Sequence, residues 1–379
     1  MKLMHLSDLH LGKRVYGFSM IEDQRYILGQ ILELAKQEKP DGVLLAGDIY
    51  DKAVPAAEAV QLLDFFLTAL AELGTAVFLI SGNHDSPERM SFLAQLLHSR
   101  KIYIAQVYEG KTEPVILKDR WGEAGIYLLP FLRSSTVRHA LPKQAEDIQN
   151  CQDALQKAIG QMEIPKDRRN VLLAHQFVTG AGRCESEEVF VGGIDQVDAA
   201  LFDAFDYVAL GHIHSPQHIG RPEVRYCGTP LKYSFSECGQ EKSVTIVELR
   251  EKGTVEIRLV PLVPLRDMRA VRGSYLEVTA RSFYEGSHTE DYLEVTLTDE
   301  EDVPDGMQKL RVIYPNLMRL TYDNRRTKED RDLDVVLEPE KKTEPELFEE
   351  FFERQNNRPM SDSQRSHVQK LVEELKAGG

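Results

Sequence analysis

Five short apolar stretches, each running directly into polar residues of the same few types, constrain the fold of this chain more than any other feature. They read MKLMHLSDLH, GVLLAGDIYD, AVFLISGNHD, NVLLAHQ and YVALGHIH. Continuous apolar runs of this length are typical of strands that are buried on both faces. Between the early runs, residues 22–39 and 56–73 show the periodic apolar face of a helix. Strands that alternate with helices predict an α/β fold built in layers.

The polar residues that follow these runs are the candidate site. In layered α/β folds the ligand site lies outside the carboxyl ends of the strands. A single histidine at a strand end is usually a surface or hydrogen-bonded residue, but five strand ends in order carry residues that bind metals. We therefore expect the following residues to form one site: Asp8, His10, Asp48, Asn83, His84, His175, His212 and His214.

The chemistry of this set points to metal ions. Carboxylate oxygens, imidazoles and one amide oxygen suit Mn, Fe or Zn better than Ca or Mg. The pairs Asp8/His10 and His212/His214 are two residues apart, so both side chains of a pair can turn to one side of an extended strand end. Without His84, the seven remaining ligands are too many for one tetrahedral ion and suit two ions that share Asp48. The other histidines are expected to be core or surface residues: His5, His98, His139, His218, His288 and His367.

The order D-x-H…GD…GNHD…H…GHxH resembles that of the calcineurin-like metallophosphoesterases. The blocks LSDLHLGKR, LLAGDIYDKAVPAAEAV, SGNHDSPER and YCGTPLKYSFSE are further similar to the nuclease subunits of double-strand-break repair complexes, over most of residues 1–260. The resemblance implies an α/β fold with a layered β-sandwich metallophosphoesterase core flanked by helices. It also implies a smaller α/β capping domain and C-terminal helices.

The resemblance implies a role for each site residue. Asp8, His10 and His214 would hold one metal, and Asn83, His175 and His212 the other. Asp48 would bridge two divalent ions, taken to be Mn²⁺. His84 would contact the scissile phosphate and help the leaving oxygen depart. Asp85 would orient His84 or the turn around it.

The implied function is a metal-dependent DNA nuclease that hydrolyses phosphodiester bonds at DNA ends and hairpins through a two-metal mechanism. It would act as a homodimer with an SbcC-type coiled-coil ATPase in DNA repair and recombination. Candidate phosphate contacts are Lys13, Arg14, Arg89 and Arg183.

Two other functions remain open. The first is hydrolysis of another phosphoester, by a protein phosphatase or a small-molecule phosphodiesterase. Against a protein phosphatase, the block GDIYDKA has Lys52 where those enzymes carry the arginine of V-D-R-G. The second is a catalytically inactive binding scaffold, which would have lost ligands that this chain retains.

Charge, cysteine content and the length of the apolar runs limit which classes of protein this chain can belong to. The net charge of −15 argues against a broad nucleic-acid-binding surface, because phosphate affinity comes largely from Lys and Arg. Much of the acidic excess lies in residues 285–305, so a phosphate-binding surface must be local or depend on metal ions. The four cysteines show no CxxC spacing and are expected to be reduced thiols of a cytoplasmic protein. No apolar run approaches the roughly 20 residues that span a bilayer.

The sequence pattern changes after about residue 243. Residues 243–250, 254–262, 275–281 and 291–298 alternate and predict half-exposed strands. We expect a nuclease domain (1–262), a small α/β capping domain (263–325), a charged linker (326–342) and a partner-binding pair of C-terminal helices (343–379). Capping-box sequences at residues 343–346 and 361–364 mark the two helix starts. The apolar stripes of these helices are compatible with docking of a partner and equally compatible with packing against each other or against the body of the protein.

Overall fold

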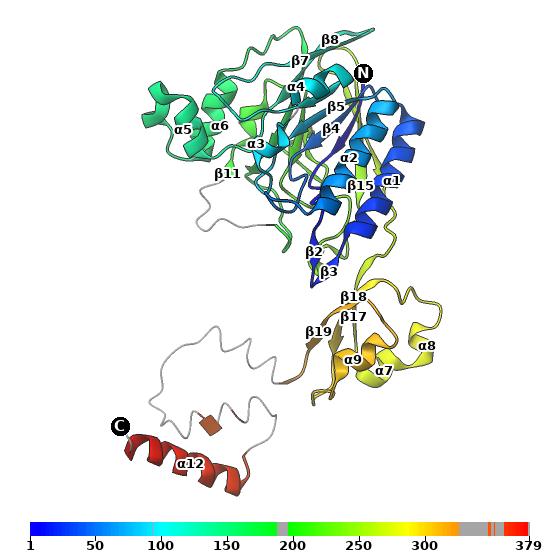
Figure 1. Cartoon of the computed structure of the whole chain (residues 1–379), viewed down its shortest axis with the longest axis vertical. Helices are drawn as coiled ribbons and strands as arrows, with labels where there is room; N and C mark the ends of the chain where they lie inside the picture. The colour runs from blue at the N-terminus through cyan, green and yellow to red at the C-terminus, as the bar shows by residue number, and fades with distance from the viewer. Residues whose placement is uncertain (93, 188–195, 326–347, 350–351, 353–359, 378–379) are drawn as a thin grey trace. The chain divides into compact units, whose positions relative to one another are not determined.

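A computed structural model gives the structure of residues 1–92, 94–187, 196–325, 348–349, 352 and 360–377 (Figure 1). The chain divides into two compact units, Met1–Asp267 and Met268–Gly379. The functional domains 1–262, 263–325 and 343–379 remain predictions, and the predicted linker lies outside the described residues. All four cysteines are free, as expected. Among the described residues, no helix is both long and apolar enough to cross a membrane.

The first unit is built on two six-stranded sheets, with the orders β16-β15-β1-β4-β5-β6 and β13-β14-β12-β9-β8-β7. Strands β1, β4, β5 and β6 run parallel to one another, as do β14, β12, β9 and β8. The first sheet contains β1 (Lys2–Leu6), β4 (Gly42–Ala46), β5 (Ala76–Ile80), β6 (Ile102–Ile104), β15 (Ser243–Leu249) and β16 (Val255–Pro261). The second contains β7 (Val115–Asp119), β8 (Gly122–Leu128), β9 (Arg169–His175), β12 (Tyr207–Gly211), β13 (Gln217–Ile219) and β14 (Arg221–Tyr226).

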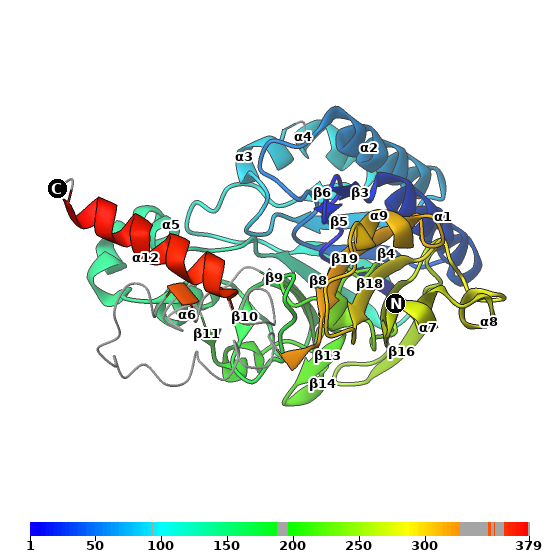
Figure 2. The same cartoon turned by 90° about the horizontal axis from the view of Figure 1, so that it is seen from below.

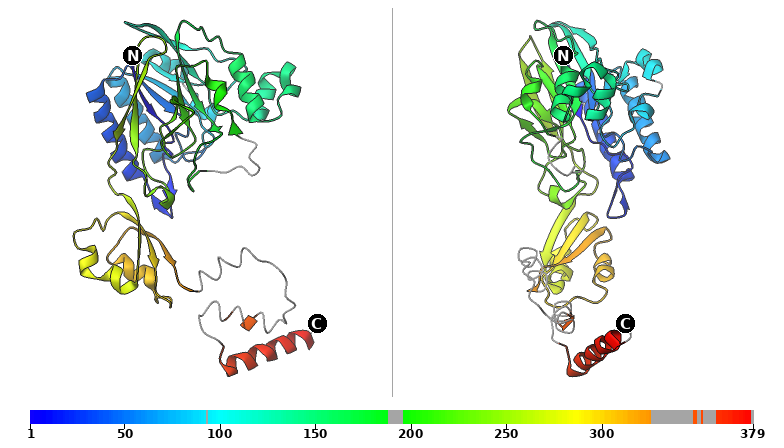
Figure 3. Two further views of the ribbon diagram at one scale, coloured as in Figure 1. Left: turned by 180° about the vertical axis from the view of Figure 1, so that it is seen from behind. Right: turned by 90° about the vertical axis from the view of Figure 1, so that its left-hand side faces the viewer.

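The two sheets pack face to face around a shared core. Leu44 and Phe78 of the first sheet meet Leu173 and Ala209 of the second in one buried cluster. Figure 3 shows the two layers from the side, with the N-terminal part in blue and the middle of the chain in green. This sandwich confirms the predicted layered core.

Helices cover the outer faces of both sheets. Helices α5 (Ser134–Ala140) and α6 (Cys151–Gly160) pack on the second sheet, where Leu172 and Leu210 join Leu155 of α6 in a further buried cluster. Because successive residues of β9 and β12 face opposite cores, both strands are buried on both faces, which explains their continuous apolar sequence.

Helices α1 (Ile21–Glu38) and α2 (Ala57–Glu72) lie together on the side of the first unit opposite α5 and α6 (Figures 1 and 2). Their apolar faces are buried, for example at Ile31 of α1 and Phe66 of α2. The ends of both helices differ by one residue from the predicted ranges, so these two predictions are confirmed.

The remaining elements of the first unit are short. They are β2 (Arg14–Val15), β3 (Phe18–Ser19), α3 (Pro87–Met90), α4 (Ala94–Leu97), β10 (Phe177–Val178), β11 (Gln196–Val197) and the 3₁₀ turns η1 (His98–Arg100), η2 (Pro142–Asp147), η3 (Ala199–Phe202) and η4 (Phe235–Glu237).

The described part of the second unit contains a small α/β fold, as predicted. Its parallel sheet has the order β17-β18-β19. Leu293 and Val295 of the central strand pack with Val278 and Leu310 from two of the helices. The elements are β17 (Met268–Gly273), α7 (Tyr275–Thr279), α8 (Arg281–Tyr284), β18 (Tyr292–Leu297), α9 (Gly306–Arg311) and β19 (Leu317–Tyr322).

Two strand predictions need correction. The pentapeptide YLEVT occurs twice, as helix at residues 275–279 and as strand at 292–296, so the strand predicted over 275–281 is wrong. The first copy follows Ser274, which forms a capping box with Glu277: the Glu277 amide donates to Ser274 Oγ at 3.3 Å. The second copy is paired on both sides in the sheet. Residues 243–249 are not half-exposed either, because β15 lies between β1 and β16 and is almost entirely buried.

Helix α12 (Asp362–Ala377) begins where the second capping box predicts. The Gln364 amide donates to Ser361 Oγ at 3.4 Å, and the Ser361 amide donates to Gln364 Oε1 at 2.9 Å. The first predicted helix start, at residues 343–346, lies outside the described residues.

Leu44→Ala should lower the free energy of unfolding by about 2–5 kcal/mol, because it opens a cavity in the core between the sheets. Leu259→Ala is the matched control: Leu259 is 44% exposed on β16, and its loss should cost about 0.5 kcal/mol. Urea unfolding followed by circular dichroism measures both. Equal losses would contradict the inter-sheet core.

Candidate metal centre

The carboxyl ends of the parallel strands of both sheets meet, and the loops that follow them are joined by hydrogen bonds. The amide of Asp8 donates to the Gly47 carbonyl at 3.0 Å, and the amide of His10 to the Asp48 carbonyl at 2.9 Å. Across the two sheets, the His212 amide donates to Asp8 Oδ1 at 2.9 Å. The loops after β1, β4 and β12 therefore form one rim, as the strand-end argument predicted.

Four residues of this rim have left-handed backbone conformations. Asp8, His10, Asp48 and His212 have φ angles of 53°, 44°, 47° and 101°. Such angles are uncommon for residues other than glycine, and they cost free energy that the surrounding structure must supply. These backbone angles produce sharp turns, and the turns direct side chains from neighbouring loop positions toward one small volume.

Three glycines make this convergence possible. A Cβ atom on Gly47 would overlap the His175 ring, one on Gly82 would overlap the Asp48 carboxylate, and one on Gly211 would overlap the Ala46 carbonyl oxygen. Gly47 also has a φ of +88°. The glycines of the GD, GNHD and GHIH blocks are thus needed for close approach.

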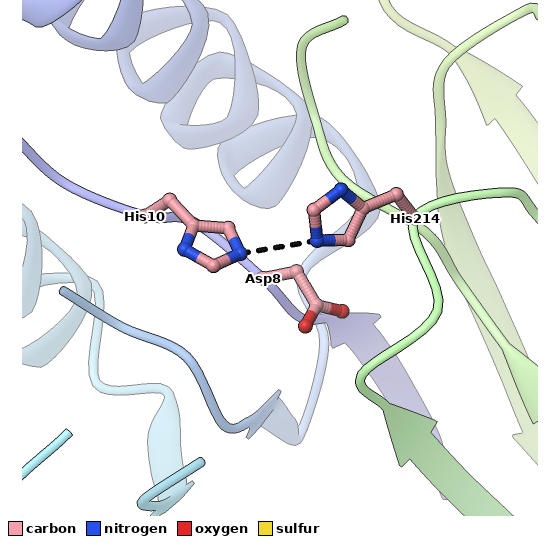
Figure 4. Close-up of side chains that lie close together, drawn as sticks. All are labelled: Asp8, His10 and His214. Atoms are coloured by element: carbon pink, nitrogen blue, oxygen red, sulfur yellow. Dashed lines mark hydrogen bonds between the residues drawn. The ribbon is translucent and has the colours of Figure 1, made fainter. Parts of the chain in front are cut away.

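One ligand cluster contains Asp8, His10 and His214, whose ligand atoms lie within 4.8 Å of one another (Figure 4). The Nε2 atoms of His10 and His214 face each other at 3.1 Å. Burial lowers the pKa of both imidazoles well below the usual value, so both rings are neutral near pH 7. Neutral ring nitrogens that converge beside a buried carboxylate fit a divalent cation.

A second cluster lies on the other side of Asp48. Asn83 Oδ1 is 3.0 Å from both His175 Nε2 and His212 Nδ1. Burial lowers the pKa of His212 to about 3. These three side chains again offer converging oxygen and nitrogen donors, of the kind that Mn, Fe or Zn accept.

Asp48 lies between the two clusters. Its Oδ2 is 3.4 Å from His175 Nε2 and 3.7 Å from His10 Nε2. Burial alone would raise the pKa of Asp48, but the neighbouring His175 and His10 outweigh it and hold that pKa well below its usual value. An ionised carboxylate between two donor sets fits the position of a shared ligand.

The predicted site residues therefore come together from five strand ends, and their donors fit divalent metal ions. Which residue binds which ion remains a prediction.

His84 and Asp85 occupy different environments. His84 Nδ1 is 3.0 Å from the Asp51 carbonyl, and its Nε2 is 3.9 Å from Asp48 Oδ2. Asp85 is buried and accepts hydrogen bonds of 2.9 to 3.0 Å from the backbone amides of Ile49, Tyr50 and Gly82. These bonds join the loops after β4 and β5, which supports the turn-orienting role among the two offered for Asp85.

The candidate phosphate contacts are partly engaged by the protein itself. Lys13 pairs with Asp51 at 2.8 Å, and the Arg183 guanidinium stacks 4.4 Å from the centre of the Phe177 ring. Arg14 bonds to the carbonyl of Gly17. Arg89 lies in α3.

His5 is a core residue, as expected. It is fully buried, and its Nδ1 is 2.9 Å from the hydroxyl of Tyr207.

Comparison with known proteins agrees with the motifs. Residues 1–216 match the calcineurin-like phosphoesterase family. The SbcD subunit of the SbcCD nuclease from Staphylococcus saprophyticus is 31% identical over 382 residues, which cover 99% of this chain and 98% of the relative. The chain belongs to the calcineurin-like phosphoesterases and, within them, to the SbcD family. Residues 264–356 also match a family described as the type 5 capsule protein repressor C-terminal domain. The resemblance inferred from the motifs is thereby confirmed.

Two solved structures are similar to parts of this SbcD-family chain. The protein TT1561 of Thermus thermophilus has a TM-score of 0.37 and 16% identity, covering 68% of this chain and 98% of that one. A dimetal phosphatase from Danio rerio has a TM-score of 0.41 and 11% identity, covering 70% of this chain and 98% of that one.

A group of residues around His214 was missed by the sequence analysis. Ser186 Oγ is 2.6 Å from His214 Nδ1, and Glu187 Oε1 accepts from the His214 amide at 2.7 Å. Behind them, Glu237 and Lys242 form a buried ion pair at 2.6 Å. The sequence signal for Glu237 was its place in the block YCGTPLKYSFSE, one of the blocks that carried the resemblance; Ser186 carried no signal.

Gly211→Ala should abolish metal binding and lower the free energy of unfolding by about 1–3 kcal/mol, because its new Cβ pushes β12 away from β4. The control is Gly29→Ala in α1, where the added methyl meets open space and favours the helix. Equilibrium dialysis against Mn²⁺ and urea unfolding measure the two effects. Full metal binding by the Gly211 variant would contradict the close approach described here.

Proposed function

We propose that this SbcD-family chain is a DNA nuclease subunit that hydrolyses phosphodiester bonds at DNA ends and hairpins. The observation that carries the proposal is the convergence of eight metal-binding and proton-donating side chains from five strand ends. The 31% identity to a nuclease subunit over 99% of the chain supports DNA as the substrate.

The proposed cofactor is a pair of divalent ions, Mn²⁺ by preference. Asp8, His10 and His214 would hold one, Asn83, His175 and His212 the other, and Asp48 both. Bound divalent ions lower the pKa of water and neutralise the oxygens of the phosphodiester. They also offset the net charge of −15, which by itself disfavours DNA.

His84 is the proposed general acid. Because a carbonyl oxygen can only accept, the Asp51 carbonyl fixes the proton of His84 on Nδ1. Nε2 then remains as the atom that gives its proton to the departing oxygen when the imidazole is protonated. The Asp48 carboxylate lies 3.9 Å from Nε2.

The proposed assembly is a homodimer that works in the cytoplasm with an SbcC-type coiled-coil ATPase. Support comes from the match of residues 264–356 to a C-terminal domain family and from the near full-length relation to a subunit of the SbcCD nuclease. Residues 343–379 are the proposed docking segment for the ATPase.

His84→Gln should lower the rate of linear duplex DNA cleavage in Mn²⁺ by about 10²–10⁴-fold, because the variant cannot donate a proton to the leaving oxygen. Metal stoichiometry should be unchanged, since His84 is not one of the proposed ligands. Cleavage assays and equilibrium dialysis, run on the same preparations, measure the two quantities.

An aryl phosphomonoester serves as the second substrate in this experiment. Its turnover without DNA cleavage, even with the ATPase added, would mean that the substrate class is wrong. Bound metal without turnover of any phosphoester would instead favour a binding scaffold.

Deletion of residues 343–379 should abolish co-purification with the coiled-coil ATPase and leave Mn²⁺ binding intact, because every proposed ligand lies in the first unit. Affinity capture of the ATPase with full-length and truncated chains tests this. Equal capture would place the docking segment elsewhere.

A further inference from the structure

The histidines of the metal centre are oriented in two different ways. His175 Nδ1 lies 2.9 Å from the main-chain carbonyl of Ala46, which leaves Nε2 for a cation. His214 Nδ1 instead meets a side chain, the hydroxyl of Ser186, at 2.6 Å. A hydrogen bond to the outer ring nitrogen of a ligating histidine fixes its tautomer and direction.

The hydroxyl of Ser186 has a defined direction. It donates its single proton to Glu237 Oε1 at 2.6 Å, so it must accept the hydrogen bond from His214 Nδ1. The Nδ1–H tautomer of His214 follows, and with it a free lone pair on Nε2, the atom that faces His10.

Glu237 is held as an ionised acceptor. It is fully buried, and Lys242 Nζ pairs with its Oε2 at 2.6 Å. Further donors to the same carboxylate are the Ser186 and Ser234 hydroxyls, the Thr229 hydroxyl and the Tyr233 amide. A buried ion pair contributes little net stability, because desolvation offsets the attraction. Its placement beside a ligand histidine points to a role in positioning.

The same group also holds the backbone of His214. Lys242 Nζ donates to the His214 carbonyl at 2.9 Å, and Glu187 accepts from the His214 amide at 2.7 Å. His214 is thereby fixed at its amide, its carbonyl and its outer ring nitrogen.

We propose that Ser186 is a positioning residue for one of the two metal sites, linking the Glu237–Lys242 ion pair to His214 and holding Nε2 toward the cation. The inference deepens the proposed function and rests on His214 being a metal ligand. It concerns the site of Asp8, His10 and His214, and not that of Asn83, His175 and His212.

The test compares Mn²⁺ binding by the full-length wild type and Ser186→Ala. The variant should bind Mn²⁺ about 10–100-fold more weakly at one of two sites, with the other unchanged. The Mn²⁺ concentration for half-maximal DNA cleavage should rise by a similar factor, while the rate at saturating Mn²⁺ stays near the wild-type value. Isothermal titration and cleavage assays measure both effects.

Two further serine variants control the test. Ser99→Ala removes an exposed hydroxyl that bonds to the Leu96 carbonyl, outside the hydrogen bonds around His214, and should leave both sites unchanged. Ser186→Thr keeps a hydroxyl and should restore binding. Thermal unfolding in EDTA should give similar midpoints for all three variants, which separates lost affinity from lost structure.

His214→Ala distinguishes failure of this inference from failure of the proposed function. If this variant loses one site while Ser186→Ala binds like Ser99→Ala, the positioning role is wrong and the ligand set stands. If His214→Ala binds both ions as the wild type does, the ligand set is wrong and the inference falls with it.

A double-mutant cycle tests the link to the ion pair. Glu237→Gln should weaken the same site, and Ser186→Ala in the Glu237→Gln background should add little, because both changes interrupt one chain of hydrogen bonds. Additive losses would overturn the link.

Discussion

The close approach of the strand ends of two different sheets is the constraint on which the site depends. Gly211, at the end of β12, lies so near the Ala46 carbonyl that a methyl group would not fit between them. The same carbonyl oxygen is hydrogen-bonded to His175 Nδ1. One main-chain atom therefore limits how the sheets can pack and also orients the ring of a proposed ligand. Each donor cluster contains residues from both sheets. A looser contact between the sheets would therefore pull the members of each cluster apart.

This arrangement is costly before any cation binds. Asp8, His10, Asp48 and His175 are buried together, and three of the four have left-handed backbone angles. The core between the sheets, with Leu44, Phe78 and Leu173 at its centre, supplies the stabilisation that offsets this cost. The helices on the outer faces add to this stabilisation, since they bury the second face of the strands whose ends carry the proposed ligands. The fold thus stabilises a buried cluster of oxygen and nitrogen donors whose types fit divalent cations.

The sequence predicts most of this architecture, and the predictions that were wrong failed for physical reasons. Continuous apolar runs identify strands with two buried faces, and short motifs at their ends identify every proposed ligand. The pentapeptide YLEVT shows the limit of local pattern, because Ser274 turns one copy into a helix while strands on both sides keep the other extended. The hydrogen bond between Ser186 and Glu237 joins residues 51 positions apart, and no periodicity or spacing predicts such a pair.

The two donor clusters also differ in which substitutions can alter the orientation of their histidine rings. The ring of His175 is oriented by a main-chain carbonyl, which every substitution at position 46 retains. The ring of His214 is oriented by side chains from two segments of the chain, Ser186 from one and Glu237 and Lys242 from the other. Any of these three can change without altering a proposed ligand. The affinity of the His214 cluster can therefore be tuned through residues outside it, whereas that of the His175 cluster is tied to the packing of the sheets. Under the proposed ligand assignment, two sites that share Asp48 would in this way bind their ions with different strength.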